Sequence, residues 1–284
     1  MVKKGENMNA IIFRCYHING ALIDVIEYYL QTQKLNKDTK LILIIKSHLT
    51  LEDIYKIIKD RYDIDFNYKD NIIVLETEYK LIYLTLDNIL IMDYGTTSVL
   101  PYTFASHYHV IYDHDKNYIK RFYDYISRST YTVYNEMPYG IGNIDYKLKF
   151  PFELYKKVNK NRPNCYINCS GKSAMELTRA LTLTDKNIIV SGDKKIKSTD
   201  RITVLTKHPK NFFELWDTYM YIHDGKYFEP RCRLLMESYY YNKNIIYDNQ
   251  YKIKDGSWYR YNELQEIGLE DRFFKSDDPI IGII

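Results

Sequence analysis

Residues 219–247 read YMYIHDGKYFEPRCRLLMESYYYNKNIIY and are the most informative segment of this chain. Its first five residues form an apolar run typical of a buried strand, and the polar residues 224–226 end that run. Pro230 is favoured in the first turn of a helix, where its missing N–H costs nothing, and helix formers without a glycine follow it. Asn242 can end this helix in the left-handed conformation, and the apolar run 245–247 predicts another strand.

Two glutamates belong to the helical part of this segment, Glu229 at its start and Glu237 eight positions later. At 1.5 Å per residue they are separated by roughly 12 Å. The N–H groups and the dipole at a helix start favour a phosphate. A sugar beside Glu229, a diphosphate at the helix start and a ribose beside Glu237 would make a nucleotide sugar. The alternative is an amphipathic surface helix with two solvated glutamates.

This arrangement resembles the Glu-x7-Glu helix of retaining GT-B glycosyltransferases, closely over residues 202–249 and loosely over the rest of the C-terminal half. The resemblance implies an α/β fold of the GT-B type, with two Rossmann-like domains facing each other across a cleft. It also implies that Glu229 contacts hydroxyls of the donor sugar and that Glu237 binds the ribose. The chain departs from the family near Pro230 and at Asn242, where glycines are usual.

A further donor-side candidate is Gly171-Lys172-Ser173, which follows a predicted strand and opens a predicted helix. A phosphate-binding P-loop would need a glycine where this chain has Tyr166, so that motif is absent. The resemblance implies a basic residue here that neutralises the donor diphosphate. Gly171 and Lys172 are therefore candidates for binding the donor; the rivals of Lys172 are Arg179, Lys194 and Lys195.

Two arginines flank the start of the Glu229 helix. Arg231 and Arg233 are candidates for the diphosphate, because a guanidinium group matches the geometry of phosphate oxygens. On this scheme the helix start and these cations neutralise the leaving group, and no metal is required.

The first half of the chain carries candidates of its own. The resemblance implies a histidine near the donor sugar, and His107 and His109 are equal candidates for it. Gly20 follows the first predicted strand, where a glycine allows a ligand to approach the backbone closely. Asp113 and Asp115 have the Asp-x-Asp spacing of metal-dependent GT-A enzymes, which would imply another fold. The donor helix in the other half favours GT-B.

Composition sets broader limits. The 284 residues carry 40 Lys and Arg against 37 Asp and Glu, a net charge of +3 that does not by itself indicate nucleic-acid binding. The 31 tyrosines, with abundant Asn, Ile and Lys, suggest an AT-rich genome such as that of a bacteriophage. Cys165 and Cys169 have no second pair or nearby His, so we expect reduced cysteines rather than a zinc site. We see no signal peptide and no membrane span, and expect a cytoplasmic protein, in the host cytoplasm if it is viral.

Strands and helices alternate on both sides of a Gly- and Pro-rich break at 135–162, which predicts two α/β units. We therefore expect an N-terminal acceptor-side domain at 1–150 and a C-terminal nucleotide-sugar-binding domain at 151–284. Predicted strands lie at 8–15, 41–45, 71–75, 81–84, 88–92, 110–112, 165–168, 187–191 and 201–205; predicted helices lie at 21–33, 51–61, 116–126, 173–183 and 211–219.

The expected function is transfer of a hexose, with retention, from a nucleotide-diphosphate sugar. A UDP-sugar is the leading candidate for this donor. One expected acceptor is a hydroxymethylated pyrimidine in phage DNA, whose phosphates would meet basic residues of the first half (Arg14, Lys46, Lys116 and Lys120). A polysaccharide or protein acceptor is the other possibility. The alternative from a different class is a non-catalytic nucleotide- or nucleic-acid-binding module.

Overall fold

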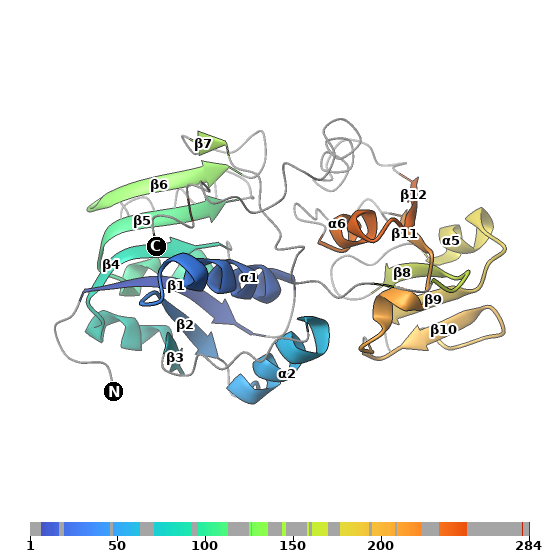
Figure 1. Cartoon of the computed structure of the whole chain (residues 1–284), viewed down its shortest axis with the longest axis horizontal. Helices are drawn as coiled ribbons and strands as arrows, with labels where there is room; N and C mark the ends of the chain where they lie inside the picture. The colour runs from blue at the N-terminus through green and yellow to red at the C-terminus, as the bar shows by residue number, and fades with distance from the viewer. Residues whose placement is uncertain are drawn as a thin grey trace. The chain divides into compact units, whose positions relative to one another are not determined.

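A computed structural model of the chain describes residues 7–16, 20–45, 48–62, 71–92, 96–112, 125, 127–135, 144–145, 158, 161–169, 177–192, 195–207, 209–222, 233–248, 280 and 284. The chain divides into two compact units (Figure 1). Unit 1 comprises Met1–Tyr155 and Asp271–Ile284, and unit 2 comprises Lys156–Glu270. This division puts Asp271–Ile284 with unit 1, whereas the sequence assigns the whole of 151–284 to the second domain.

Unit 1 contains a seven-stranded sheet in the order β3-β2-β1-β4-β5-β6-β7. All of its described strand pairs are parallel. The order 3-2-1-4-5-6 is that of a doubly wound Rossmann sheet, in which the strand order reverses between β1 and β4. The strands are β1 Met8–Cys15, β2 Lys40–Ile45, β3 Ile72–Leu75, β4 Leu86–Ile91, β5 Ala105–Tyr112, β6 Thr130–Asn135 and β7 Ile144–Asp145.

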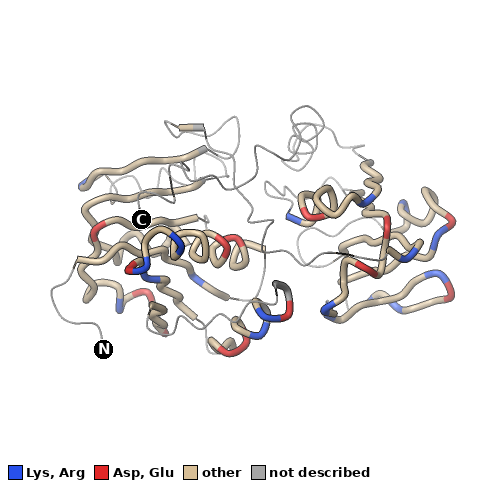
Figure 2. The backbone as a smooth tube through the Cα atoms, viewed as in Figure 1, with Lys and Arg blue, Asp and Glu red and all other residues tan. Residues whose placement is uncertain are grey.

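In the described part of unit 1, the connections between these strands contain α1 Gly20–Leu35, α2 Leu51–Tyr62 and the 3-10 helices η2 Glu78–Tyr83 and η3 Thr96–Tyr102. α2 begins at a reciprocal capping box, in which the Thr50 N–H donates to Asp53 Oδ2 at 2.9 Å and the Asp53 N–H donates to Thr50 Oγ1 at 3.2 Å. α2 is therefore entered through Thr50. Charged residues of both signs lie along α2, whereas α1 is mostly uncharged (Figure 2).

One face of the unit 1 sheet packs against η2 and η3. Ala10, Ile12 and Ile89 lie on this face and form a cluster with Leu81 of η2 and Val99 of η3. Burying each large aliphatic side chain stabilises the fold by about 1.5–3 kcal/mol. The continuous apolar run of β2 is buried, as predicted for a parallel strand.

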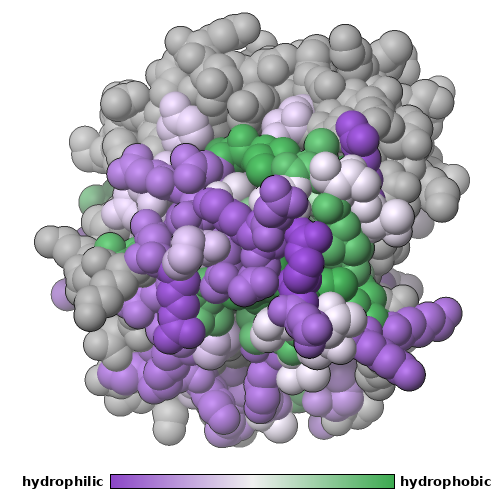
Figure 3. All heavy atoms as spheres, turned by 90° about the vertical axis from the view of Figure 1, so that its right-hand side faces the viewer, coloured by the Kyte–Doolittle hydropathy of each residue, from purple (hydrophilic) through white to green (hydrophobic). Residues whose placement is uncertain are grey.

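Unit 2 contains a five-stranded parallel sheet in the order β10-β9-β8-β11-β12, so its strand order reverses between β8 and β11. The edge strand β10 is preceded by the exposed charged residues Lys195, Lys197, Asp200 and Arg201. Figure 3 shows mostly hydrophilic residues on this side of the unit, with a smaller hydrophobic area. The elements are β8 Cys165–Cys169, α5 Leu177–Leu183, β9 Ile188–Gly192, β10 Ile202–Leu205, η6 Phe212–Glu214, β11 Thr218–Ile222, α6 Arg233–Tyr240 and β12 Asn244–Asp248.

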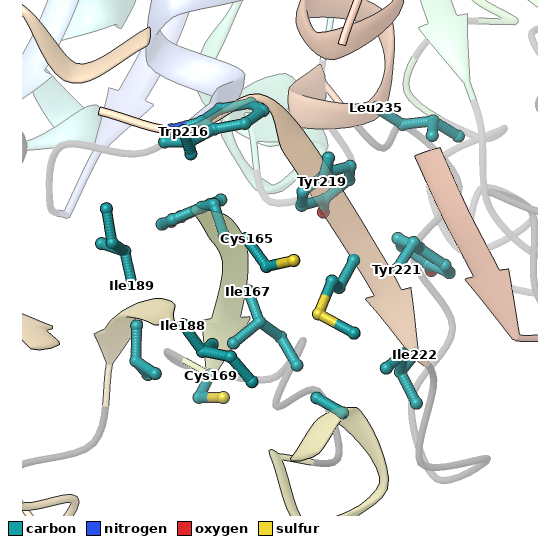
Figure 4. Packing of buried hydrophobic residues seen from close by; sticks show 14 of the residues in the cluster. Cys165, Ile167, Cys169, Ile188, Ile189, Trp216, Tyr219, Tyr221, Ile222 and Leu235 are labelled. Carbon is teal, nitrogen blue, oxygen red and sulfur yellow. The ribbon is translucent and has the colours of Figure 1, made fainter. Parts of the chain in front are cut away.

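Aromatic and aliphatic side chains share the core of unit 2 (Figure 4). Tyr166, Trp216 and Tyr219 are buried, and their rings lie 5.3–6.2 Å apart between centroids. Lys243 lies at the amino edge of the sheet, directly before β12. Its Nζ donates to Trp216 O at 2.8 Å and also to Phe213 O and Asn161 Oδ1. Burial lowers the pKa of Lys243 to about 8.

Several predicted elements need correction. The predicted strand at 81–84 is largely the 3-10 helix η2, and most of the predicted helix at 211–219 is η6 followed by the start of β11. Short apolar runs do not distinguish a strand from a buried helical turn, which explains both errors. β5 begins five residues before its prediction, and β6 has no predicted counterpart. The predicted helix at 116–126 lies outside the described residues except for Tyr125.

Candidate functional site

α6 starts beside the point where the strand order of unit 2 reverses. β11 and β12 are parallel neighbours, so the connection between them returns from the carboxyl edge of the sheet to its amino edge. The first residues of α6 therefore lie toward the carboxyl edge. Ligands of doubly wound sheets bind outside that edge at the reversal point.

Glu237 is buried on α6 and forms an ion pair. Its side chain is 2% exposed, and the Nε–H of Arg233, whose side chain is 8% exposed, donates to Oε1 at 2.9 Å. A buried carboxylate of this kind requires a partner, because burying an unpaired charge costs several kcal/mol. The alternative of a surface helix with two solvated glutamates is therefore wrong for Glu237. Arg233, a candidate for binding the diphosphate, therefore contacts Glu237, the candidate for binding the ribose.

The end of α6 confirms the predicted role of Asn242. Its φ of 52° is left-handed. The Lys243 N–H donates to Ser238 O at 2.9 Å, and the Asn242 N–H donates to Tyr239 O at 3.1 Å. These two bonds form a Schellman motif, which satisfies the last carbonyl groups of the helix. Glu237 and Arg233 lie one turn apart within the helix that this motif ends.

The remaining donor-side candidates fall outside the described residues. They are Glu229, Arg231, Gly171 and Lys172, together with the rival Lys194. Of the other rivals, Arg179 lies on α5 and Lys195 is exposed. The pairing of Glu229 with Glu237 across a donor sugar and ribose stays a prediction.

His107 and His109 stack against each other in the body of β5, with ring centroids 4.1 Å apart. His107 Nε2 lies 3.0 Å from Thr132 Oγ1, and His109 Nδ1 lies 3.2 Å from the Tyr134 hydroxyl. Burial lowers the pKa of both rings, and for His109 burial together with His107 brings the pKa to about 4. His109 is therefore neutral at physiological pH. A catalytic role for either histidine stays a prediction.

The reversal point of unit 1 contains a polar cluster that the sequence argument only touched on. Arg14 lies next to the end of β1, and its guanidinium contacts Ser98 Oγ at 2.7 Å and Glu78 Oε1 at 3.0 Å. Its backbone N–H donates to Thr96 Oγ1 at 3.2 Å. One signal was available in the sequence: an arginine that interrupts the apolar run of a buried parallel strand needs polar partners.

Gly20, a candidate for close approach of a ligand, is the first residue of α1 and follows β1 on this same edge of the sheet. The donor-binding role of Gly20 stays a prediction, because residues 17–19 between it and β1 lie outside the described part of the chain.

Within the described ranges, no three His, Cys, Asp or Glu side chains form a group that could hold a metal ion. Asp113 and Asp115 lie outside those ranges. Cys15 and Cys169 are buried thiols, and burial raises the pKa of each to about 11.

No helix in the described part of the chain is long and apolar enough to cross a bilayer.

The sequence matches no protein-family model and no curated protein. Among solved structures, the chain is similar to a glycosyltransferase from Rickettsia africae ESF-5, at 11% identity and a TM-score of 0.47. That similarity covers 92% of this chain and 89% of the other. An identity this low leaves the role of every residue here to be argued from the chain itself.

Proposed function

We propose that this chain is a retaining glycosyltransferase of the GT-B type that uses a nucleotide-diphosphate sugar. The leading candidate for this donor is a UDP-sugar. One observation carries the proposal: a buried glutamate, Glu237, held by Arg233 on the helix that leaves the reversal point of a doubly wound sheet. A carboxylate there accepts hydrogen bonds from the two ribose hydroxyls of a nucleotide. Arg233 positions that carboxylate and offsets its charge.

In the proposed reaction, the oxygen of an acceptor hydroxyl forms a bond to the anomeric carbon on the face that the diphosphate leaves. The bond between that carbon and the diphosphate oxygen breaks, and the leaving diphosphate takes the hydroxyl proton. Catalysis then depends on positioning and on stabilising the leaving charge. Glu229, Lys172 and Arg231 are the proposed contacts to the sugar and the diphosphate.

The first test is a mass-spectrometric screen of nucleotide sugars that scores both slow donor hydrolysis and transfer. Glu237→Gln removes the charge but keeps the shape, so we expect the affinity for the donor and for free UDP to fall about tenfold to a hundredfold. Glu27→Gln is the matched control, because Glu27 is a fully buried glutamate on a helix of the other unit. Equal affinity for UDP in wild type and Glu237→Gln would contradict the role of Glu237.

The second test concerns the acceptor. Labelled donor is offered to hydroxymethylated DNA, to unmodified DNA and to neutral oligosaccharides. Labelling of hydroxymethylated DNA alone would identify the phage-DNA acceptor, whereas labelling of an oligosaccharide alone would identify a glycan acceptor. UDP binding without any turnover would identify the non-catalytic nucleotide-binding module instead.

A further inference from the structure

Lys243 is a buried lysine that connects three segments of unit 2. The residue is 6% exposed and directly precedes β12. Its Nζ donates to Trp216 O at 2.8 Å, just before β11, to Phe213 O in η6 and to Asn161 Oδ1, just before β8. These acceptors are 27, 30 and 82 residues away along the chain. An ammonium group has three donors, so three acceptors satisfy its hydrogen bonds completely.

The Lys243 side chain does not act as an ordinary helix cap. A lysine near the end of a helix can bind the last carbonyl groups of its own helix and interact with the helix dipole. None of the three acceptors of Lys243 Nζ belongs to α6, the helix that ends just before this residue. The side chain therefore attaches the end of α6 to other parts of unit 2.

The backbone of Lys243 is joined to the turn of α6 that contains Glu237. The Lys243 N–H donates to Ser238 O at 2.9 Å, and Ser238 directly follows Glu237. The Tyr241 N–H donates to Glu237 O at 3.0 Å. A displacement of Lys243 would therefore be transmitted to the turn that carries the Glu237 carboxylate.

Apolar packing alone holds α6 less specifically. Leu235 and Met236 of α6 are fully buried, and Leu235 belongs to the core of unit 2. The hydrophobic effect is non-directional, so this packing keeps the helix on the sheet without fixing its exact position. Hydrogen bonds require a narrow range of distances and angles. The three bonds of Lys243 therefore add a directional constraint at the end of the helix.

We propose that Lys243 is a positioning residue that fixes the end of α6 and so places Glu237 for contact with the ribose of the donor. The role toward the donor rests on the proposed glycosyltransferase function, whereas the fixing of α6 does not. A functional group that moves by about 1 Å can lose about a hundredfold in its effect, even when the substitution lies far from the ligand.

The test compares Lys243→Met, which keeps an unbranched side chain but removes the donors, with the wild type. Calorimetry measures the affinity for whichever of UDP, GDP and ADP the wild type binds most tightly. Hydrogen–deuterium exchange measures the protection of residues 233–240. We expect the affinity to fall at least about tenfold and the exchange of α6 to become faster, because the end of the helix has lost its directional constraint.

Ile188→Ala is the matched control for a general loss of stability. Ile188 is a fully buried residue of unit 2 on β9. β8 separates β9 from β11 and β12, the two strands that α6 contacts. The cavity should destabilise unit 2, while the nucleotide affinity of the folded protein and the exchange of α6 relative to the rest of the unit stay as in the wild type.

Asn161 offers a second pair of variants with a low risk of misfolding, because this residue is exposed. Asn161→Ala removes one acceptor of Lys243 and should weaken nucleotide binding in the same direction as Lys243→Met, but less. Asn161→Asp keeps an oxygen that accepts from the ammonium group and should bind the nucleotide as the wild type does. If Lys243→Met does not fold, this pair decides the test, and equal affinity in Asn161→Ala and wild type would overturn the proposal.

Two results with folded Lys243→Met would also overturn it: a nucleotide affinity equal to that of the wild type, or an equal fall in Ile188→Ala. In both cases the proposed function stands as long as the wild type binds the nucleotide. If the wild type binds none of the three nucleotides, the proposed function fails together with the role of Lys243 toward the donor. The exchange of α6 then decides alone whether Lys243 fixes the helix: faster exchange only in Lys243→Met supports this, and unchanged exchange contradicts it.

Discussion

Unit 1 and unit 2 share the order of their central strands but differ in the connections at the point where that order reverses. In unit 1, η2 and η3 replace full helices, and the polar group there is Arg14 with Ser98 and Glu78. In unit 2, the connection after β11 contains α6, which buries Glu237 with Arg233. The shared topology thus determines where a ligand binds, whereas the connecting segments determine which side chains contact the ligand.

The two units also differ in the polar groups that they bury within their sheets. Unit 1 buries the imidazole of His109, whose Nε2 has no hydrogen-bond partner among the described groups. Unit 2 buries Lys243, whose Nζ contacts three acceptors. The hydrogen bonds of the Lys243 amine are satisfied, whereas the buried imidazole of His109 makes its unit sensitive to acid.

The largest effect is expected from separating the ion pair of unit 2. Glu237→Leu leaves the Arg233 guanidinium without its carboxylate partner, so we expect the free energy of unfolding to fall by about 3–5 kcal/mol. Arg233→Met/Glu237→Leu removes both charges and should recover most of that loss. Both tryptophans of the chain lie in unit 2, so urea unfolding followed by tryptophan fluorescence reports this unit.

The same double variant sharpens the functional assignment. It should fold but bind UDP no better than Glu237→Gln, because the ribose has lost its acceptor. If the double variant is as unstable as Glu237→Leu, the pair is not what holds α6. If it binds UDP normally, Glu237 is structural only.

Unit 1 should respond to acid through His109. The folded pKa is about 4 against the ordinary value of 6.5, so the unfolded state binds a proton that the folded state does not. The stability from the neutral ring is fully present above pH 6.5 and is lost as the pH falls from 6.5 to about 4. Allowing for solvent screening, we expect a loss of about 1–2 kcal/mol.

Hydrogen–deuterium exchange of the β5 and β6 peptides measures this loss in unit 1 alone. His109→Asn keeps a hydrogen-bonding group toward Tyr134 but does not titrate, so its exchange should change less between pH 6.5 and 4. His107→Asn is the companion variant, and it should retain most of the acid response because His107 is less buried. Parallel pH profiles for wild type and His109→Asn would contradict the prediction.

The smallest effect is expected at the end of α6. Asn242→Ala puts a Cβ into the left-handed conformation without the local hydrogen bonding of Asn, which costs about 1 kcal/mol. Asn242→Gly relieves the steric cost and should be neutral or slightly stabilising. Urea unfolding of the two variants, again followed by tryptophan fluorescence, should place them on opposite sides of the wild type or place glycine level with it. Equal losses would show that the left-handed φ does not matter for stability.

Local signals in the sequence were sufficient for several elements. β1 was predicted with its observed bounds, the start of α2 follows from Thr50, and the end of α6 follows from Asn242. Each of these depends on residues within a few positions of one another. The strand at 81–84 failed because an apolar run of that length packs equally well as a helical turn under the sheet.

The candidate site was likewise predicted only in part. The sequence identified Glu237 and Arg233 as functional candidates from a spacing and from chemistry. It assigned Arg233 to a phosphate, however, and treated the two side chains as separate contacts. Their direct pairing and their burial depend on the core of unit 2, which packs around α6 from residues far away in the sequence.

The α/β class, the alternation of elements and the positions of the helix caps could be read from the amino-acid sequence, because these follow from the hydrophobic period and from the backbone preferences of single residues. The order of the strands and the placement of Arg14 beside Glu78 and Ser98 became visible only in the folded molecule. These features join residues tens of positions apart, and their free energy comes from burial and pairing that exist only once both sheets have formed.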